Sequence, residues 1–550
     1  MDNTLYYGDN LAILRDLIVK ESVDLIYLDP PFNSNRNYNV LFREESGSES
    51  EAQITAFKDT WHWNQATAHT YDEIVTTAPD DIATLINAMK TFVGANQMMA
   101  YLVMMTARLI ELHRVLKPTG SLYLHCDPTA SHYLKIILDT IFGAQNFRNE
   151  IVWVRTSAHA NVSQKFGAVH DIIYFYSKSK QFKWNQQHSP YSDEYIKTFF
   201  DQKDSGGHRY ARRDLTASME RASSGQLYSW KGITPPPSRC WAMTQEKMDE
   251  FFAKGRIHFP QKKDGMPRLK LYPEDLPGVP IQDVWTDIRP LHNLAAERLG
   301  YPTQKPVELL KRILQASSNE GDVVLDAFCG CGTSIAAAQE LNRKWIGIDI
   351  THLSIALQKY RLRDAFKLIE NKDYVVIGEP TDLYGAKQLA EDNRYQFQWW
   401  ALSLVQAIPT GSSFGSKIGK KGADRGIDGV INFTESGKDK LKKVLIQVKS
   451  GKVKSGDIRD LRGTMDRESA ALGVFITLEK PSSQMIAEAC DAGFYQTFTG
   501  ATKYPKIQIL TVEELLHGAE IKMPPRLHSN FKVAQRIPKK TNQSQPSLYE

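Results

Sequence analysis

The residues best suited to chemistry surround a glycine-rich turn in the segment VVLDAFCGCGTSIAAAQELNRKWIGIDI (residues 323–350). The pattern predicts a strand that ends at Asp326, a loop, a helix that begins near Thr333, and a second strand that ends at Asp349. Gly330 and Gly332 let the loop turn tightly and approach a ligand closely. A carboxylate at the end of the second strand can accept hydrogen bonds from ribose hydroxyls. The segment therefore indicates a site for a nucleotide-like cofactor. A tight structural turn is the alternative.

A second candidate motif is Asp29-Pro30-Pro31-Phe32, directly after the apolar run VDLIYL. The two prolines fix the backbone and remove its amide donors. The Asp29 carboxylate and a backbone carbonyl then present only acceptors, beside the flat face of Phe32. This combination suits the exocyclic amine of a base stacked on an aromatic ring. A proline-stiffened turn with a surface acid is again the structural alternative.

Short apolar runs that alternate with helical patterns must position these motifs. We expect strands at residues 23–28, 121–125, 323–328, 345–350 and 374–377, which predicts an α/β fold with a mostly parallel sheet covered by helices. Residues 151–290 interrupt this alternation with hairpin-like runs at 151–155 and 171–176, a triple-proline loop and many aromatic residues. This region has 21 basic and 15 acidic residues. It is predicted to be an inserted recognition region for a polyanion.

The order of three motifs resembles that of a known family. Asp29-Pro30-Pro31-Phe32 comes first, Thr303-Gln304-Lys305-Pro306 follows, and the Phe328–Gly332 loop comes last. This arrangement, over about residues 1–380, is similar to the permuted beta group of amino-directed DNA methyltransferases. The resemblance implies a Rossmann-like, doubly wound sheet that binds S-adenosylmethionine (SAM), with a target-recognition region inserted between the motifs.

The resemblance also implies roles for particular residues. Asp29, Pro30 and Phe32 would hold and stack a flipped base, and Pro31 completes the catalytic motif. The loop from Asp326 through Phe328, Gly330, Gly332 and Thr333, together with Asp349, would form the SAM pocket. Thr303, Gln304, Lys305 and Pro306 would contact the methionine end of SAM. Asp9, in the short motif Gly8-Asp9-Asn10, would lie near its adenine end.

The implied chemistry is methylation of a base amine. Hydrogen bonds to Asp29 and the Pro30 carbonyl would draw the amine nitrogen toward tetrahedral geometry, so that its lone pair attacks the methyl group without a covalent intermediate. The chain has no Pro-Cys pair, the nucleophile signature of cytosine-C5 methyltransferases. In this family, Asp at the first motif position favours adenine N6 over cytosine N4.

The substrate alternatives are RNA and protein. The basic, aromatic insert favours a nucleic acid, through phosphate contacts and base stacking, and the resemblance to DNA methyltransferases implies double-stranded DNA as the partner. Arg212, Arg213, Arg221, Lys262, Lys263 and Arg268 are candidate DNA contacts, although each is also explained as a solubilising surface charge.

Residues 394–523 are expected to fold as a helix, a strand with Asp428 at its start, a strand with Gln447 and Lys449, a helix and a strand. This order resembles the PD-(D/E)xK nucleases, most closely the Mrr-like restriction endonuclease domains. Asp428 and the Gln447 side-chain oxygen would bind Mg²⁺, a cation that prefers oxygen ligands. Lys449 would orient water or stabilise the phosphate. Gln447 and Gln398 stand where relatives have glutamate in many cases. The leading hypothesis is therefore a restriction–modification enzyme with an active nuclease. The alternative is a DNA methyltransferase whose C-terminal domain binds DNA without cutting it.

The expected organisation is a catalytic part (1–150), a recognition region (151–290), a SAM-binding part (291–380), a linker (381–393), the nuclease-like domain (394–523) and a tail (524–550). No apolar run reaches 18 residues and the N-terminus has no apolar signal core, so we expect neither a membrane span nor secretion. Five cysteines, an odd number, favour reduced thiols in a cytoplasm. A homodimer is left open.

Overall fold

The computed structural model describes residues 2–31, 62–156, 166–221, 225–260, 265–291, 295, 297, 299, 301, 303–409, 427–434, 442–497 and 502–525. The chain divides into two compact units, one made of Met1–Asn185 and Asp283–Glu550 and the other of Gln186–Gln282. Within the described ranges, no helix is both long and apolar enough to cross a bilayer. The five cysteines, all of them described, are free thiols.

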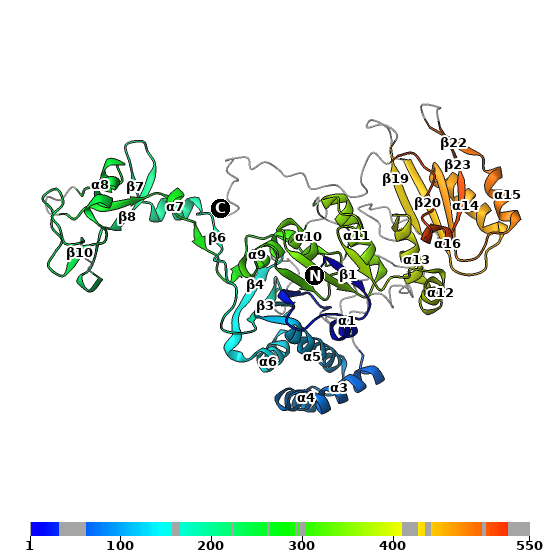
Figure 1. Cartoon of the computed structure of the whole chain (residues 1–550), viewed down its shortest axis with the longest axis horizontal. Coiled ribbons are helices and arrows are strands. Elements are labelled where there is room, and N and C mark those ends of the chain that lie inside the picture. The colour runs from blue at the N-terminus through cyan, green and yellow to red at the C-terminus, as the bar shows by residue number, and fades with distance from the viewer. Residues whose placement is uncertain are drawn as a thin grey trace. The chain divides into compact units, whose positions relative to one another are not determined.

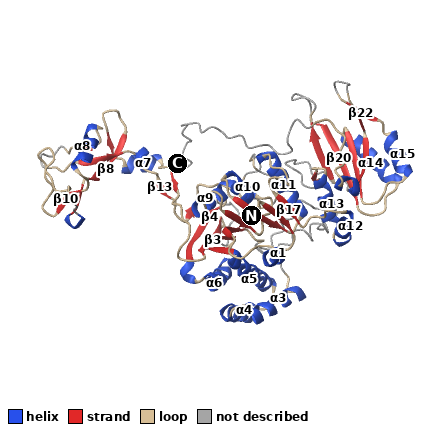
Figure 2. Ribbon diagram, viewed as in Figure 1, coloured by secondary structure: helices blue, strands red, loops and turns tan. Residues whose placement is uncertain are grey.

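A nine-stranded sheet forms the centre of the larger unit (Figures 1 and 2). In spatial order its strands are β14 (Val284–Trp285), β4 (Phe147–Val154), β5 (His170–Ser177), β3 (Leu116–Cys126), β2 (Val23–Leu28), β15 (Val323–Asp326), β16 (Lys344–Asp349), β1 (Thr4–Tyr7) and β17 (Val375–Ile377). In this sheet only β5 is antiparallel to its neighbours. The predicted mostly parallel sheet and its five predicted strands are confirmed.

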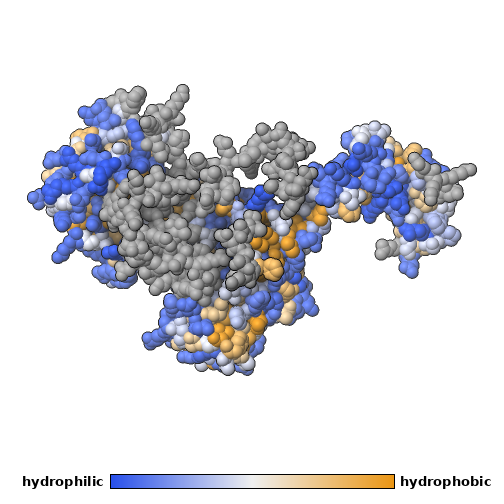
Figure 3. All heavy atoms as spheres, turned by 180° about the vertical axis from the view of Figure 1, so that it is seen from behind, coloured by the Kyte–Doolittle hydropathy of each residue, from blue (hydrophilic) through white to orange (hydrophobic). Residues whose placement is uncertain are grey.

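Helices cover this sheet (Figure 2). They are α1 (Asn10–Asp16), α5 (Gln97–Val115), α6 (Ser131–Phe142), α9 (Val307–Ser317), α10 (Thr333–Glu340) and α11 (His352–Phe366). Helices α3 (Gln65–Thr77) and α4 (Asp80–Val93) pack on α5 and α6 as an outer layer. The apolar core runs from α5 through β2, β3 and β15. Apolar residues also reach the surface over the helical layer, where α4 and α6 expose Phe92 and Ile136 (Figure 3).

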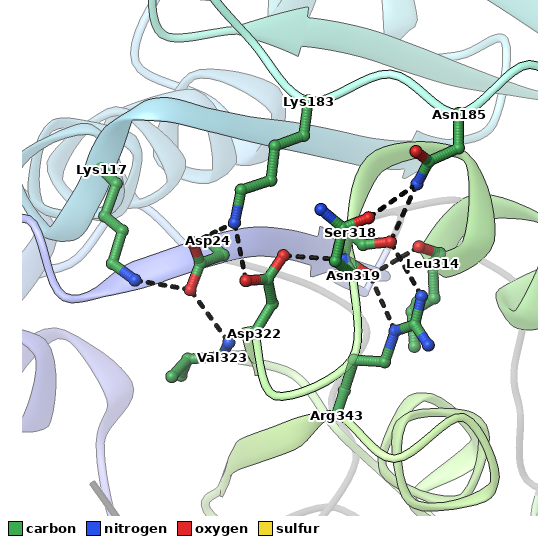
Figure 4. A network of polar contacts seen from close by, with 10 residues as sticks. All are labelled: Asp24, Lys117, Lys183, Asn185, Leu314, Ser318, Asn319, Asp322, Val323 and Arg343. Carbon is green, nitrogen blue, oxygen red and sulfur yellow. Dashed lines mark hydrogen bonds and ion pairs between the residues drawn. The ribbon is translucent and has the colours of Figure 1, made fainter.

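An ion-pair network joins β2 and β15 at their amino-terminal ends (Figure 4). The buried Asp24 carboxylate accepts hydrogen bonds from the Lys117 ammonium at 2.6 Å, the Lys183 ammonium at 2.8 Å and the Val323 amide at 3.0 Å. Lys183 also donates to Asp322 at 2.6 Å. Burial acts to raise the pKa of Asp24, but these hydrogen bonds lower it below its ordinary value. This edge of the sheet is therefore closed by fully used polar groups.

The predicted start of the recognition region, residue 151, is wrong. The runs at 151–155 and 171–176 lie in β4 and β5, which pair with each other, while β5 also pairs with β3 of the central sheet. Their resemblance to an isolated hairpin arises because β5 reverses direction within that sheet. The separate unit begins at Gln186. It has 15 basic and 12 acidic residues, so half of the basic excess of residues 151–290 lies outside it.

The smaller unit packs short elements around Trp230, Trp241 and Met248. Its strands are β6 (His188–Ser189), β7 (Gln202–Lys203), β8 (Arg209–Asp214), β9 (Thr216–Ser218), β10 (Arg239–Trp241), β11 (Ile257–His258), β12 (Arg268–Leu271) and β13 (Val279–Pro280), and its helices are α7 (Asp193–Phe199) and α8 (Gln245–Ala253). Strands β11, β12, β8 and β7 form a four-stranded sheet.

The C-terminal part of the larger unit forms its own five-stranded sheet. Its order is β18 (Ile408–Pro409), β19 (Gly429–Phe433), β20 (Lys442–Lys449), β21 (Leu472–Thr477) and β24 (Ile507–Thr511). The accompanying elements are α12 (Leu383–Asp392), α13 (Arg394–Leu404), α14 (Ser455–Glu468), α15 (Ser483–Asp491), α16 (Val512–Leu516), β22 (Phe494–Gln496) and β23 (Lys503–Pro505). The predicted helix–strand–strand–helix–strand order is confirmed.

The predicted linker at residues 381–393 is wrong. Asp382 caps α12 by accepting a hydrogen bond from the Gly385 amide at 2.7 Å, and α12 buries Ala386 in the C-terminal core. Pro380 and Gly385, which suggest a linker by composition, lie just before this helix and within its first turn. The predicted tail lies outside the described residues from position 526 onward.

Candidate active site

The two predicted motifs meet at the carboxyl-terminal edge of the central sheet. Strands β2 and β15 are parallel neighbours, so Asp29, just after β2, lies at the same edge as the loop that follows Asp326. This is the edge where open α/β sheets bind ligands. Asp29 is half-buried, Pro30 is buried and Pro31 is exposed. Phe32, the predicted stacking ring, lies outside the described residues.

Asp29 forms an ion pair that the sequence does not predict. The Lys305 ammonium lies 2.5 Å from Asp29 Oδ2, although the two residues are 276 positions apart. Lys305 is buried. Among the described residues, no donor makes a hydrogen bond to the other carboxylate oxygen, Oδ1. One oxygen of Asp29 is thus engaged and the other can accept.

The loop after β15 depends on its glycines. Gly330 and Gly332 have φ of +48° and +73°, a left-handed conformation that glycine adopts without strain. A Cβ at Gly332 would lie 2.7 Å from Gln358 Cγ, and one at Gly330 would lie 3.1 Å from the Tyr301 ring. Gln358 also holds the loop by donating to the Gly330 carbonyl at 2.8 Å. A side chain at either glycine would therefore disturb the packing of the loop.

The buried Asp326 carboxylate holds the loop through hydrogen bonds from inside the protein. Its carboxylate accepts hydrogen bonds from the Phe328 amide at 3.0 Å and from the Ser334 hydroxyl. Burial is the main cause that raises the pKa of Asp326 to about 7, and the nearby charge of Asp29 adds to the shift. Thr333 is buried at the start of α10. Asp326 and Thr333 thus shape the loop from inside the protein.

Asp349 ties the loop to β16. It accepts hydrogen bonds from the Gly330 amide and from the Thr351 amide and hydroxyl, each at 2.9 Å. Burial raises the pKa of Asp349. The Ser354 hydroxyl also hydrogen-bonds to this carboxylate. The predicted contact with a ribose hydroxyl stays a prediction.

The Gly8-Asp9-Asn10 motif is joined to the loop through an arginine. Asn10 donates to the Ala327 carbonyl at 2.7 Å and accepts from Arg108 at 2.5 Å. Arg108 pairs with Asp9 at 3.1 Å, and Asp9 caps α1. The sequence analysis missed Arg108. Its signal was a charged residue inside the apolar run of α5, where a buried cation needs partners.

A second missed group is a buried polar chain beside Asp29. The Tyr27 hydroxyl lies 3.0 Å from His125 Nδ1, and His125 Nε2 lies 3.2 Å from Asp171 Oδ2. Arg155 pairs with Asp171 at 2.7 Å. Burial acts to raise the pKa of Asp171, but the hydrogen bond and the charges around it lower the pKa overall. No motif in the sequence marks these residues, of which Tyr27, His125 and Asp171 come from β2, β3 and β5 and Arg155 follows β4.

The four residues of the segment Thr303–Pro306 have different surroundings and contacts. Thr303 is exposed and has a left-handed φ of +63°. The Gln304 side chain accepts from the Leu299 amide at 2.8 Å and donates to the Glu297 carbonyl at 2.7 Å. Lys305 contacts Asp29, and Pro306 precedes the first turn of α9. Its predicted contact with the methionine end of SAM stays a prediction.

The C-terminal site brings together the residues that the sequence predicts. Asp428 precedes β19, and β20 has Gln447 and Lys449. Asp428 Oδ1 accepts from the Gln398 amide at 2.8 Å, and Oδ2 accepts from the Val448 amide at 2.6 Å. Gln447 is buried, and its side-chain oxygen has no hydrogen-bond partner within the described ranges. Lys449 lies 4.0 Å from Asp457.

The predicted Mg²⁺ ion would have one carboxylate, Asp428, and the buried Gln447 oxygen as its side-chain ligands, and it stays a prediction. Mg²⁺ needs near-octahedral oxygen ligands and is reluctant to lose water, and carboxylates supply its protein charge. Here one carboxylate already accepts from two amide groups. The described part of the chain holds no group of three or more His, Cys, Asp or Glu arranged around a metal site.

Three of the six candidate DNA contacts, Arg212, Arg213 and Arg268, lie in the four-stranded sheet of the smaller unit. Arg212 and Lys270 are cross-strand partners in β8 and β12. Burial and the charges of Arg212, Lys270 and Arg268 lower the pKa of His258. Arg212 also pairs with Asp201 at 3.1 Å and Arg268 with Asp214 at 3.4 Å. Arg213 is exposed, the Arg221 side chain is not described, and Lys262 and Lys263 lie outside the described residues.

Comparison with known proteins identifies the family. Residues 23–357 match the family described as DNA methylase, and the chain belongs to this family. Residues 413–517 match a second family, described as NACHT-associated inactive Restriction Endonuclease 1.

Three relatives illustrate the range of similarity. Type II methyltransferase M.EcaI of Enterobacter cloacae is 31% identical over 350 residues, which cover 64% of this chain and 67% of that protein. The Mod subunit of the type III restriction-modification enzyme StyLTI of Salmonella typhimurium is 26% identical, covering 62% of this chain and 50% of that protein. The DNA adenine methyltransferase YhdJ of Escherichia coli K12 is 24% identical, covering 65% and 82%. The chain thus spans about two thirds of the first protein's length and half of the second's.

Among solved structures, PvuII DNA methyltransferase (cytosine-N4-specific) is 13% identical and covers 68% of this chain and 88% of its own, with a TM-score of 0.31. A score this low carries no argument about this chain.

Proposed function

We propose that this DNA methylase transfers a methyl group from SAM to an exocyclic amine in duplex DNA, with adenine N6 favoured over cytosine N4, as part of a restriction–modification system. The observation that carries the proposal is the position of Asp29 at the same sheet edge as the glycine loop, with Oδ1 able to accept. The StyLTI Mod subunit is named as part of a type III restriction-modification enzyme, and M.EcaI is named as a type II methyltransferase. The adenine preference is supported by Asp at the first motif position and by the name of YhdJ.

The loop and its neighbours fit SAM. Gly330 and Gly332 allow the tight, left-handed turn after β15, and Asp349 ends β16, where a carboxylate can accept from a ribose hydroxyl. The Asn10 and Arg108 contacts hold the base of the loop in place. When bound, SAM would supply an electrophilic methyl group on a sulfonium.

The protein's part in the reaction is to position and polarise the amine. Asp29 Oδ1 would accept one N–H, and the rigid backbone after it would present the Pro30 carbonyl to the other. These acceptors stabilise the positive charge that develops on nitrogen as the N–C bond forms and the C–S bond breaks. The extra proton on nitrogen then leaves to solvent or to an acceptor at the site.

The test of this proposal is methyl counting with tritium-labelled SAM on amplified genomic DNA, which carries no methyl groups, followed by nucleoside mass spectrometry. We expect N6-methyladenine from the wild type and none from Asp29→Ala. N4-methylcytosine would overturn the adenine assignment. A fully active Asp29→Ala protein, or methyl incorporation into RNA or protein instead of DNA, would overturn the proposal as a whole.

For the C-terminal domain we propose contact with DNA without cleavage. The support is the two amide donors on Asp428, the glutamines at positions 398 and 447, and the similarity to an inactive endonuclease family. Exposed Lys452, Lys454 and Arg459 follow β20 and could meet phosphates. The Mg²⁺-dependent nuclease expected from the sequence stays a prediction. Cleavage of unmethylated plasmid with Mg²⁺ by the wild type, lost in Lys449→Ala, would establish it and refute this proposal.

A further inference from the structure

Asp29 differs from the other aspartates at this edge of the sheet in how it is held. Asp9, Asp326 and Asp349 each accept a hydrogen bond from the backbone amide two residues later, at 2.7 Å, 3.0 Å and 2.9 Å respectively. This local turn fixes the carboxylate without help from distant residues. The residue two positions after Asp29 is Pro31, which has no amide hydrogen. The carboxylate that the reaction uses therefore lacks the usual local donor.

Lys305 supplies a donor in its place. Its ammonium lies 2.5 Å from Asp29 Oδ2, and the side chains of Lys305 and Asp29 are only 10% and 17% exposed. A pair so shielded from water is screened little by salt, and a charge-assisted hydrogen bond is stronger than a neutral one. The contact is therefore strong enough to restrict the rotation of the Asp29 carboxylate.

The chain around Lys305 is itself fixed. On one side, the Gln304 side chain bonds the backbone of Glu297 and Leu299. On the other side, α9 begins, and its first amide, Val307, donates to the Glu297 carboxylate at 3.2 Å. Thr303 adopts a left-handed φ of +63°, which is costly for a β-branched residue and persists only where the surroundings impose it. These contacts place the Lys305 backbone independently of its ammonium.

We propose that Lys305 is a positioning residue for methyl transfer. It holds Asp29 Oδ2 so that Oδ1 faces the amine of the target base, a task that Pro31 cannot perform. This inference rests on the proposed methyltransferase function and deepens it. It differs from the role that the family resemblance implies, in which the Thr303–Pro306 segment binds the methionine end of SAM. The two roles predict different kinetics.

The experiment compares Lys305→Met, Lys305→Arg and the wild type in the full chain. Methylated positions are first mapped by sequencing of DNA treated with the wild type, and a duplex oligonucleotide with that site is made. The single-turnover rate is measured with SAM and DNA both saturating, and the Kd for SAM is measured by calorimetry. Lys311→Met serves as the matched control, because Lys311 pairs with Glu308 and Glu340 at the surface of α9.

We expect Lys305→Met to slow the single-turnover rate by roughly 10- to 100-fold, because a misplaced acceptor costs that much. The Kd for SAM should stay within about threefold of the wild type, a change of under 1 kcal/mol. Lys305→Arg, which keeps a cationic donor, should recover part of the rate. Lys311→Met should match the wild type in both measurements.

Two results would overturn the inference. One is a Lys305→Met protein whose Kd for SAM rises more than tenfold while its rate at saturating SAM equals that of the wild type. The other is an unchanged rate and an unchanged Kd. Neither result touches the proposed function, since wild-type methylation would persist. A wild type that methylates no DNA would instead refute the function itself.

Discussion

Strand β2 has an aspartate near each end, and the two are held differently. Near the amino end, Asp24 is buried and accepts from two ammonium groups and one amide (Figure 4). Just past the carboxyl end, Asp29 accepts from one ammonium, and its second oxygen can receive another donor. The comparison teaches that the number of acceptor positions already used separates a carboxylate that joins strands from one that can act on a ligand.

The strongest test of this comparison is to remove the Asp29 carboxylate. Asp29→Asn should lower the single-turnover methylation rate by about 100-fold or more, because the amide loses the charge that stabilises the transition state. The urea midpoint of unfolding should fall less than that of Asp24→Asn, because Asp29 contacts one ammonium where Asp24 contacts two, and the asparagine oxygen can still accept from Lys305. The comparison fails if this variant unfolds much earlier and methylates normally.

Removing the Asp24 carboxylate should instead lower the stability and leave the methylation rate nearly unchanged. Asp24→Asn should lower the free energy of unfolding by about 2–3 kcal/mol at pH 7, because breaking a buried ion pair costs several kcal/mol and the half-exposed lysines recover part of it in water. The methylation rate of the folded protein should stay within about threefold. Urea titration and single-turnover assays on the same preparation measure both effects.

The stability difference between the wild type and Asp24→Asn should depend on pH in a direction set by the pKa of Asp24. The lowered pKa of Asp24 means that its contribution is present above the ordinary value of 3.8 and is lost as the pH falls through the folded-state pKa. The stability gap between the wild type and Asp24→Asn should therefore narrow below about pH 4. A gap that widens in acid would show that Asp24 does not act through its charge.

At the carboxyl-terminal edge of the sheet, the contribution of Asp326 to stability should change with pH in the opposite direction. Burial raises its pKa to about 7, so the stability associated with its protonated form is lost as the pH rises from the ordinary value of 3.8 through about 7. Between pH 5 and pH 8 the wild type should lose on the order of 2 kcal/mol that Asp326→Asn keeps. Urea unfolding of both proteins at these two pH values measures the difference. Equal losses would mean that Asp326 stays ionised throughout.

Local patterns account for the parts of this molecule that the sequence predicts. The strand at residues 23–28 was predicted with its observed bounds, and the glycine loop was placed between the right strands, because both depend on neighbours within about ten residues. The order of elements around Asp428 followed from the same kind of signal. Where a segment's own periodicity decides its structure, the sequence is sufficient.

Contacts between distant segments were not predicted. Lys305 was placed beside the cofactor because its motif has that role in the family, whereas its pairing with Asp29 depends on how α9 meets β2. The chain from Tyr27 to Asp171 joins three strands and has no sequence signature. The boundary at 151 failed for a related reason, since an antiparallel pair inside a parallel sheet has the local pattern of a free hairpin.

The C-terminal site extends the comparison to a third aspartate and to the smallest expected effect. Asp428 accepts from an amide side chain and a backbone amide, so it resembles Asp24 in having both oxygens engaged, although its donors carry no charge. A carboxylate used in this way holds β20 and α13 to the start of β19.

Lys449→Ala should leave the methylation rate within about twofold, because Lys449 contacts neither Asp29 nor the glycine loop. Plasmid DNA incubated with Mg²⁺ should stay intact with either protein, measured by gel electrophoresis beside the methylation assay. If Lys449→Ala instead weakens DNA binding in a filter assay and makes its loss with salt less steep, the phosphate-contacting surface extends to the end of β20. If the wild type cuts and the variant does not, the engaged oxygens of Asp428 must exchange their amide donors for a metal when DNA binds.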